Sequence, residues 1–81
     1  MTRKMAMKLE ELFARILREP IHVFSDAASP STVRSWDSLR HIELVMAAEA
    51  AYGIRFETSE VTTIRTLGCM RGMLQQKGVT A

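Results

Sequence analysis

Apolar residues recur at helical spacing in three stretches of the chain. The first stretch runs from about Arg3 to Arg18. Its apolar positions form one stripe, which consists of Met5, Leu9, Leu12, Phe13, Ile16 and Leu17. Pro20 disfavours a helical conformation in the residue before it, so the helix should end near Arg18 or Glu19. We therefore expect a first amphipathic helix over about residues 3–18.

The segment between Pro20 and Trp36 has no sustained period and is rich in Ser, Ala, Asp and Pro. This composition predicts a loop of roughly 15 residues, which is long for a compact domain. We expect four of its apolar residues to hold it to the core, namely Ile21, Val23, Phe24 and Val33. A short turn of helix around Ser25 to Ala28 is compatible with the pattern.

The second periodic stretch begins after Asp37, whose carboxylate can accept hydrogen bonds from the unpaired N–H groups of a first helical turn. Ser38 then takes the first helical position. The pattern continues to Tyr52, and Gly53 supplies a stop in the left-handed conformation. We expect Leu39 to point inward and to anchor the first turn.

The residues after Gly53 form a connection. Ile54-Arg55-Phe56 alternates like a strand, but the sequence offers no second strand to pair with it. We therefore expect an extended linker that buries Ile54 and Phe56. Further along, Ser59-Glu60-Val61 predicts a single helical turn.

The third periodic stretch begins after Thr66, a favourable capping residue, and reaches about Lys77, with Gly78 at its end. Its apolar side consists of Leu67, Met70, Met73 and Leu74. Gly68 and Gly72 count against a helix here, since each costs about 1 kcal/mol relative to alanine. The elements together predict an all-α fold, a small bundle of three main helices and one short turn.

The length and composition leave little room for a catalytic cleft. The chain has 81 residues, of which 47% are hydrophobic and 25% are charged, so we expect a single domain over residues 1–81. A chain of this size buries only about 60% of the surface that it exposes when unfolded. Cys69 has no second cysteine for a disulfide, and with His22 and His41 alone it cannot form a structural zinc site.

No stretch approaches the length of a membrane span, and the N-terminus lacks the pattern of a secretory signal, so we expect a cytoplasmic protein. The net charge of +2 and the cluster of Arg3, Lys4 and Lys8 leave open a basic helical module that binds nucleic acid. Such a module needs a helix lined with basic and amide side chains. The clearest helix instead carries Ala47, Ala48, Ala50 and Ala51.

Ser38 is the strongest candidate for a functional residue. A nucleophilic serine needs a base and an oxyanion site, and the G-x-S-x-G turn is absent. His41 lies three residues further on and would be its neighbour on a helix, but both are expected on an open surface, where nothing excludes water. Asp37-Ser38 is also an ordinary helix start, because both residue types are favoured there.

Asp37-Ser38-Leu39 is followed by Ile42-Glu43-Leu44-Val45-Met46-Ala47, then Glu49 and Tyr52-Gly53-Ile54. These residues resemble the phosphopantetheine attachment region of acyl carrier proteins, without a gap over residues 37–54. The flanks are similar as well, with an amphipathic helix and a long loop before the serine and Val61-Thr62-Thr63-Ile64 after it.

The resemblance implies a four-helix, acyl-carrier-like bundle whose Ser38, flanked by Asp37 and Leu39, receives 4'-phosphopantetheine from coenzyme A. A phosphopantetheinyl transferase would attach this arm, and its thiol would hold an acyl group as a thioester. The protein would deliver this group and would not be an enzyme. The expectation is physically reasonable, because a helix N-terminus favours a phosphodiester.

The resemblance also implies that the helix after Ser38 contacts partner enzymes. The matching positions are Leu39, Glu43, Met46 and Glu49, two apolar residues and two acids. Arg40 stands close enough to help screen the phosphate. The implied partners are acyl-loading and acyl-processing enzymes, such as a ligase, an acyltransferase or a ketosynthase, and the carrier would be a monomer.

Several residues depart from the carriers of fatty acid synthesis, which are acidic along this helix. Arg40 and His41 lie near its start, Ala50 replaces a frequent acid, and Ser35 replaces a frequent glycine. Trp36 before the aspartate is more typical of free-standing carriers of polyketide, mixed peptide or small-acid loading pathways. A housekeeping fatty acid carrier stays open, as does a carrier-like protein that has lost its arm.

The remaining candidates for chemistry are given no function. We expect His41 to be a surface residue. We expect Cys69 to be a small, partly buried apolar residue of the last helix rather than a reactive thiol.

Overall fold

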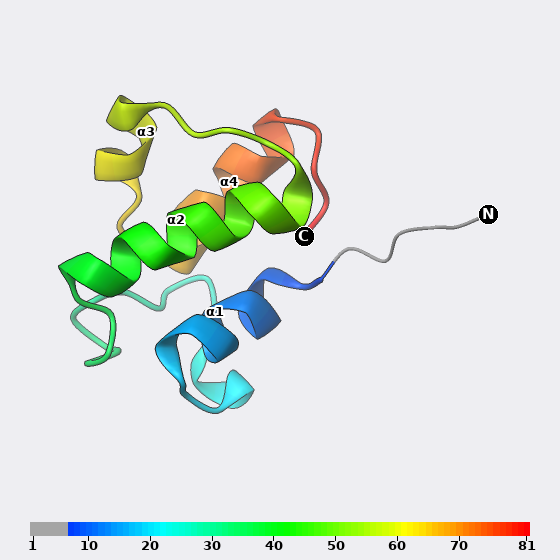
Figure 1. The fold of residues 1–81 in the computed structure, drawn as a ribbon. Helices are drawn as coiled ribbons and strands as arrows, with labels where there is room; N and C mark the ends of the chain where they lie inside the picture. The colour runs from blue at the N-terminus through cyan, green and yellow to red at the C-terminus, as the bar shows by residue number, and fades with distance from the viewer. Residues whose placement is uncertain (1–6) are drawn as a thin grey trace.

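The computed structural model describes residues 7–81, whose backbone forms four α-helices and no strand (Figure 1). The helices are α1 (Leu9–Leu17), α2 (Ser38–Tyr52), α3 (Thr58–Thr63) and α4 (Leu67–Gln76). A short 3-10 turn, η1 (Ile21–Val23), lies in the connection between α1 and α2. In Figure 1 α2 crosses the middle of the molecule, with α1 below it, α3 above it and α4 behind it. The all-helical bundle expected from the sequence is confirmed.

Helix α1 is shorter than the sequence pattern predicts. It begins at Leu9, and Lys8 before it is extended. The backbone N–H of Lys8 donates to the Glu11 carboxylate at 3.3 Å, which satisfies a group that the helix itself cannot satisfy. The predicted start at Arg3 and the apolar residue Met5 lie outside the described residues.

The core is built from α1, α2, α4, the long loop and the connection between α3 and α4. Its buried side chains are Leu9, Leu12, Phe13, Leu17, Phe24, Ala28, Val33, Trp36, Leu44, Val45, Ala48, Ile64, Leu67, Met70 and Leu74. The Phe13 ring of α1 meets the Phe24 and Trp36 rings edge-on, with centroids 6.0 and 5.2 Å away. These aromatic contacts fix both ends of the loop against α1.

The predicted loop anchors are half right. Phe24 and Val33 are buried, as expected, but Ile21 and Val23 are exposed. The two exposed residues belong to η1, which contributes no buried side chain to the core. The sequence also allowed a short turn around Ser25 to Ala28. The structure has a single turn there, in which the Ala28 N–H donates to the Ser25 carbonyl at 3.0 Å.

The same turn covers the start of α4. The N–H groups of Leu67 and Gly68 donate to the carbonyls of Ala28 and Asp26, each at 3.0 Å. A Cβ on Gly68 would lie 2.9 Å from the Asp26 Cβ and 3.0 Å from its carbonyl oxygen. The glycine that weakens the sequence prediction is therefore the residue that allows the loop to approach α4.

Arg71 in the middle of α4 connects distant parts of the chain. Its guanidinium donates to Glu10 of α1, to Asp26 at 3.0 Å and to the carbonyl oxygen of Ala81. One side chain thus joins α1, the loop and the C-terminal residue to α4. Like the turn over Gly68, this network holds the loop close to α4.

The linker after α2 is extended and packs against the core, but its two apolar residues are less buried than predicted, and the predicted turn at residues 59–61 is a helix of six residues, α3. Ile54 and Phe56 are half-buried, and the Phe56 N–H donates to the Glu49 carboxylate at 2.9 Å. Helix α3 contributes no fully buried side chain. It is held in part by an ion pair, 3.0 Å long, between Glu60 and Lys77 at the end of α4.

Candidate functional site

Ser38 is exposed and is the first residue of α2, as the sequence predicts. The Asp37 side chain caps the helix by accepting the Arg40 N–H at 2.9 Å. The N–H groups of Ser38 and Leu39 donate to no group in residues 7–81. The hydroxyl therefore stands beside two free backbone donors at the electropositive end of a 15-residue helix.

A buried tryptophan fixes the turn that presents Ser38. Trp36 is only 3% exposed, and its indole N–H donates to Nδ1 of His41 at 3.0 Å. The other ring nitrogen of His41 lies 2.9 Å from the Val61 carbonyl oxygen, which can only accept. His41 is therefore neutral in this arrangement, with its proton on Nε2. The two rings also stack, with centroids 6.0 Å apart.

The expectation that His41 is a surface residue is wrong. It is half-buried and links three segments, the loop before α2, α2 itself and the end of α3. Both of its ring nitrogens are engaged, so it has no free lone pair to act as a base toward Ser38. The Ser38–His41 pair has the sequence spacing of a dyad without the hydrogen-bonding pattern of one.

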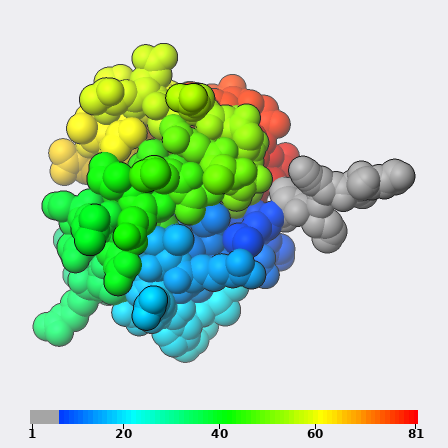
Figure 2. All heavy atoms as spheres, viewed as in Figure 1, coloured from blue at the N-terminus to red at the C-terminus, as the bar shows by residue number. Residues whose placement is uncertain are grey.

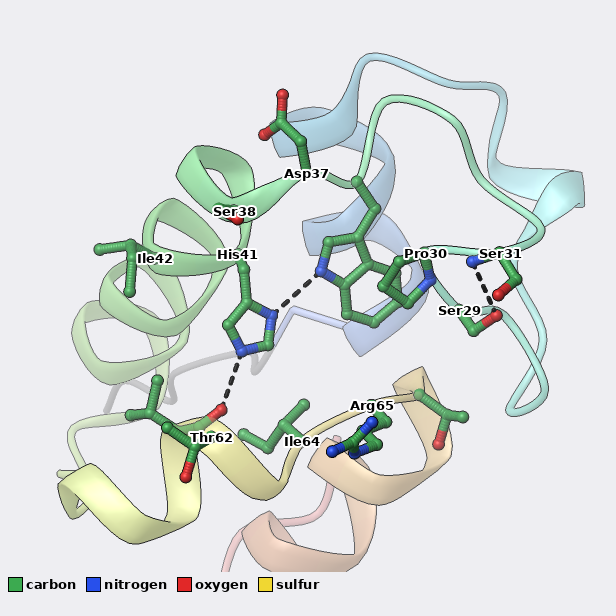
Figure 3. A pocket seen from close by; sticks show the side chains of 13 residues that line it. Ser29, Pro30, Ser31, Asp37, Ser38, His41, Ile42, Thr62, Ile64 and Arg65 are labelled. Atoms are coloured by element: carbon green, nitrogen blue, oxygen red, sulfur yellow. Dashed lines mark hydrogen bonds between the residues drawn. The ribbon is translucent and has the colours of Figure 1, made fainter.

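An open groove of about 950 Å³ lies beside Ser38 (Figure 3). It is enclosed by residues 29–31 of the loop, the start of α2, the end of α3 and the connection 64–66. Its apolar lining consists of Trp36, Ile42, Val61 and Ile64 with Pro30 of the loop. This volume is within the range of sites that hold small organic ligands.

The expectation that Leu39 points inward is wrong, because its side chain is 66% exposed. Ile42 and Met46 are also exposed, at 47% and 62%. The three residues follow one another at helical spacing, so they form an apolar stripe on the outer side of α2. In Figure 2, α2 in green lies between α1 in blue and α3 in yellow.

The charged residues of α2 that the sequence singled out have partners within the chain. Arg40 pairs with Glu43 at 2.8 Å, and both side chains are partly exposed. Glu49 is half-buried and accepts the Phe56 N–H, so it shapes the linker. Of the predicted partner contacts, Leu39 and Met46 are therefore the freely exposed ones.

Metal and thiol chemistry find no support in the described part of the chain. Residues 7–81 contain no group of three His, Cys, Asp or Glu side chains placed to hold a metal ion. Cys69 is half-buried, as expected, and its thiol lies 3.7 Å from the Thr63 carbonyl oxygen. Over the same residues, none of the helices combines the length and the apolar character that crossing a bilayer requires.

Sequence reasoning missed the residues that surround the groove. Ile42, at the helical spacing of Leu39 and Met46, could have been assigned to the outer stripe from the pattern. Arg65 also lines the groove. No sequence pattern indicated this, because its neighbours there come from the loop and from α2. The contact between His41 and the Val61 carbonyl is equally remote in sequence.

In comparisons with known proteins, no protein-family model and no curated protein matches this chain.

Proposed function

We propose that this protein carries acyl groups as thioesters on a 4'-phosphopantetheine arm attached to Ser38. The arm would come from coenzyme A, through a phosphopantetheinyl transferase. The observation that carries the proposal is the exposed Ser38 hydroxyl, beside two free N–H groups at the start of α2. A phosphodiester at this position gains from the helix dipole and from those donors.

The surroundings of Ser38 also favour delivery over catalysis. His41 cannot serve as its base, because both ring nitrogens are already hydrogen-bonded. A carrier needs no base of its own, since the chemistry takes place on partner enzymes. The groove beside Ser38 is open, so a tethered group could enter it and leave it again.

The proposed partners are enzymes that load and process acyl groups, such as a ligase, an acyltransferase or a ketosynthase. Leu39, Ile42 and Met46 provide an exposed apolar stripe next to Ser38, which suits contact with an apolar pocket. The Arg40–Glu43 pair makes this side less acidic than in fatty acid synthesis carriers. We therefore favour a monomeric, cytoplasmic carrier of polyketide or related specialised biosynthesis over the housekeeping carrier.

Incubation with coenzyme A and a broad-specificity transferase tests the proposal. Intact mass should show one added phosphopantetheinyl group on the wild type and none on Ser38→Ala. Ser59→Ala is the matched control, because Ser59 is also exposed near the start of a helix but lies outside the groove. This control should be modified like the wild type. A wild-type protein that several transferases leave unmodified would contradict the proposal.

A further inference from the structure

The groove beside Ser38 has an apolar middle. Trp36 and His41 lie there, and the Trp36 N–H and both ring nitrogens of His41 are already hydrogen-bonded, so neither ring presents a free polar atom to a ligand. Ile42, Val61 and Ile64 complete this part of the lining. A short hydrocarbon segment could pack here without leaving a polar group unpaired.

Among residues 7–81, the groove is lined by one cation, Arg65, and by one carboxylate, Asp37, which already accepts the Arg40 N–H. Arg65 is exposed and makes no ion pair or side-chain hydrogen bond with residues 7–81. By contrast, Arg40, Arg71 and Lys77 each pair with a carboxylate. The guanidinium of Arg65 therefore keeps its planar set of donors, which matches a carboxylate in two-point contact.

Arg65 lies across the groove from Ser38. In Figure 3 Ser38 is above the His41 ring and Arg65 is below it, next to Ile64. The phosphate of an arm on Ser38 would stay at the Ser38 end, beside the free N–H groups of α2. Arg65 therefore lies on the opposite side of the groove from the proposed attachment point.

We infer that the cargo is a short acyl group that ends in a carboxylate, which Arg65 binds while the hydrocarbon part lies in the apolar middle of the groove. This inference depends on the proposed attachment of the arm to Ser38. A mostly apolar site with a few placed polar or charged groups fixes the orientation of its ligand and excludes similar molecules that lack the matching group.

The test compares two cargoes of similar length on the full chain. Glutaryl ends in a carboxylate and pentanoyl ends in a methyl group. A phosphopantetheinyl transferase loads each on Ser38 from its coenzyme A thioester, transferring the acyl-phosphopantetheinyl group and releasing 3',5'-adenosine bisphosphate. In ¹⁵N NMR spectra, glutaryl should shift the Arg65 Nε–H signal and the amides of Thr62 and Thr66. Pentanoyl and the unloaded arm should leave Arg65 Nε–H unchanged.

Arg65→Gln should lower the equilibrium constant for glutaryl binding in the groove roughly fivefold, the upper range for an exposed ion pair. Its effect on pentanoyl should be small. Arg55→Gln is the matched control, because Arg55 is exposed and lies outside this groove. In the Arg55→Gln variant, glutaryl should bind in the groove as it does in the wild type.

The outcomes separate the two proposals. Equal spectra for the two cargoes, or a shift of Arg65 Nε–H with the unloaded arm alone, would overturn the inference and leave the carrier function standing. An intact mass without the arm would overturn the carrier function, and the inference with it.

Discussion

Helices α2 and α4 both start after a side chain that caps the first turn, but their first N–H groups have different surroundings. Asp37 caps α2 through the Arg40 N–H, and Thr66 caps α4 through the Cys69 N–H, each at 2.9 Å. At α4 the next free donors bond to the carbonyls of Asp26 and Ala28. At α2 no group of residues 7–81 takes the corresponding donors.

The difference shows that two helix starts with similar caps can differ in whether the rest of the chain covers them. The two caps are local and nearly equivalent, so the N-termini of both helices carry the positive end of a helix dipole. The turn at residues 25–28 covers one of them. An exposed serine with free donors therefore remains at the start of α2, and the start of α4 is structural.

The largest expected effect concerns the covered start. Gly68→Ala should destabilise the protein by about 2–3 kcal/mol, because the new Cβ would collide with Asp26 and push the turn off α4. Urea unfolding measures the change. Gly72→Ala is the control, since Gly72 lies in the same helix with nothing within 4 Å of an added Cβ. It should be neutral or gain up to about 1 kcal/mol. Equal effects at both glycines would contradict a close approach at Gly68.

The next largest effect concerns His41, which holds the turn before the open start of α2. His41→Ala should cost about 1–2 kcal/mol, because the buried Trp36 N–H loses its acceptor and the Val61 carbonyl loses its donor. His22→Ala is the control, since His22 is exposed in η1 and its change should stay within about 0.5 kcal/mol. If both substitutions cost the same, His41 does not support the turn.

The local features of these two helix starts could be read from the sequence. Asp37, Thr66 and the stop at Gly53 act through neighbours a few residues away, and all three are found where they were expected. The turn that covers α4 could not be read, because its hydrogen bonds join residues about forty apart in the chain. Nothing local distinguishes a covered helix start from an open one.

Helix α2 was harder to interpret for a different reason. It carries two apolar stripes at helical spacing, and a single pattern cannot tell which one faces the core. Leu44, Val45 and Ala48 do so, and the stripe of Leu39, Ile42 and Met46 faces outward. The same ambiguity hid His41, which continues the inner stripe and bonds to a segment twenty residues away.

Removing the two caps tests the comparison directly. Asp37→Ala and Thr66→Ala should each cost about 1 kcal/mol of stability, because each leaves one N–H of a first turn without its acceptor. Only Asp37→Ala should also slow the attachment of phosphopantetheine, measured by intact mass over time. If Thr66→Ala slows attachment as much, the effect of the cap is global and the start of α2 is not special.

The smallest effect concerns α3, which forms one side of the groove. A hydrogen bond from the Glu57 N–H and the ammonium of Lys77 hold the pKa of Glu60 below its ordinary value of 4.5. A lowered pKa in the folded state means that the carboxylate stabilises the protein above that value and loses this contribution as the pH falls through the lowered pKa. Removing the Glu60 carboxylate should therefore lower the free energy of unfolding near neutral pH and have little effect in acid.

Unfolding free energies of the wild type and Glu60→Gln, measured from roughly pH 3 to 7, check this dependence. The wild type should be slightly more stable at the upper end, and the two curves should converge as the solution becomes acidic. Lys77→Met should reproduce part of the difference, because it removes the ion pair and leaves the Glu57 hydrogen bond. A constant gap across the range would show that Glu60 acts through packing rather than charge. Neither variant should alter the Gly68 contact, because α3 lies outside the covered start of α4.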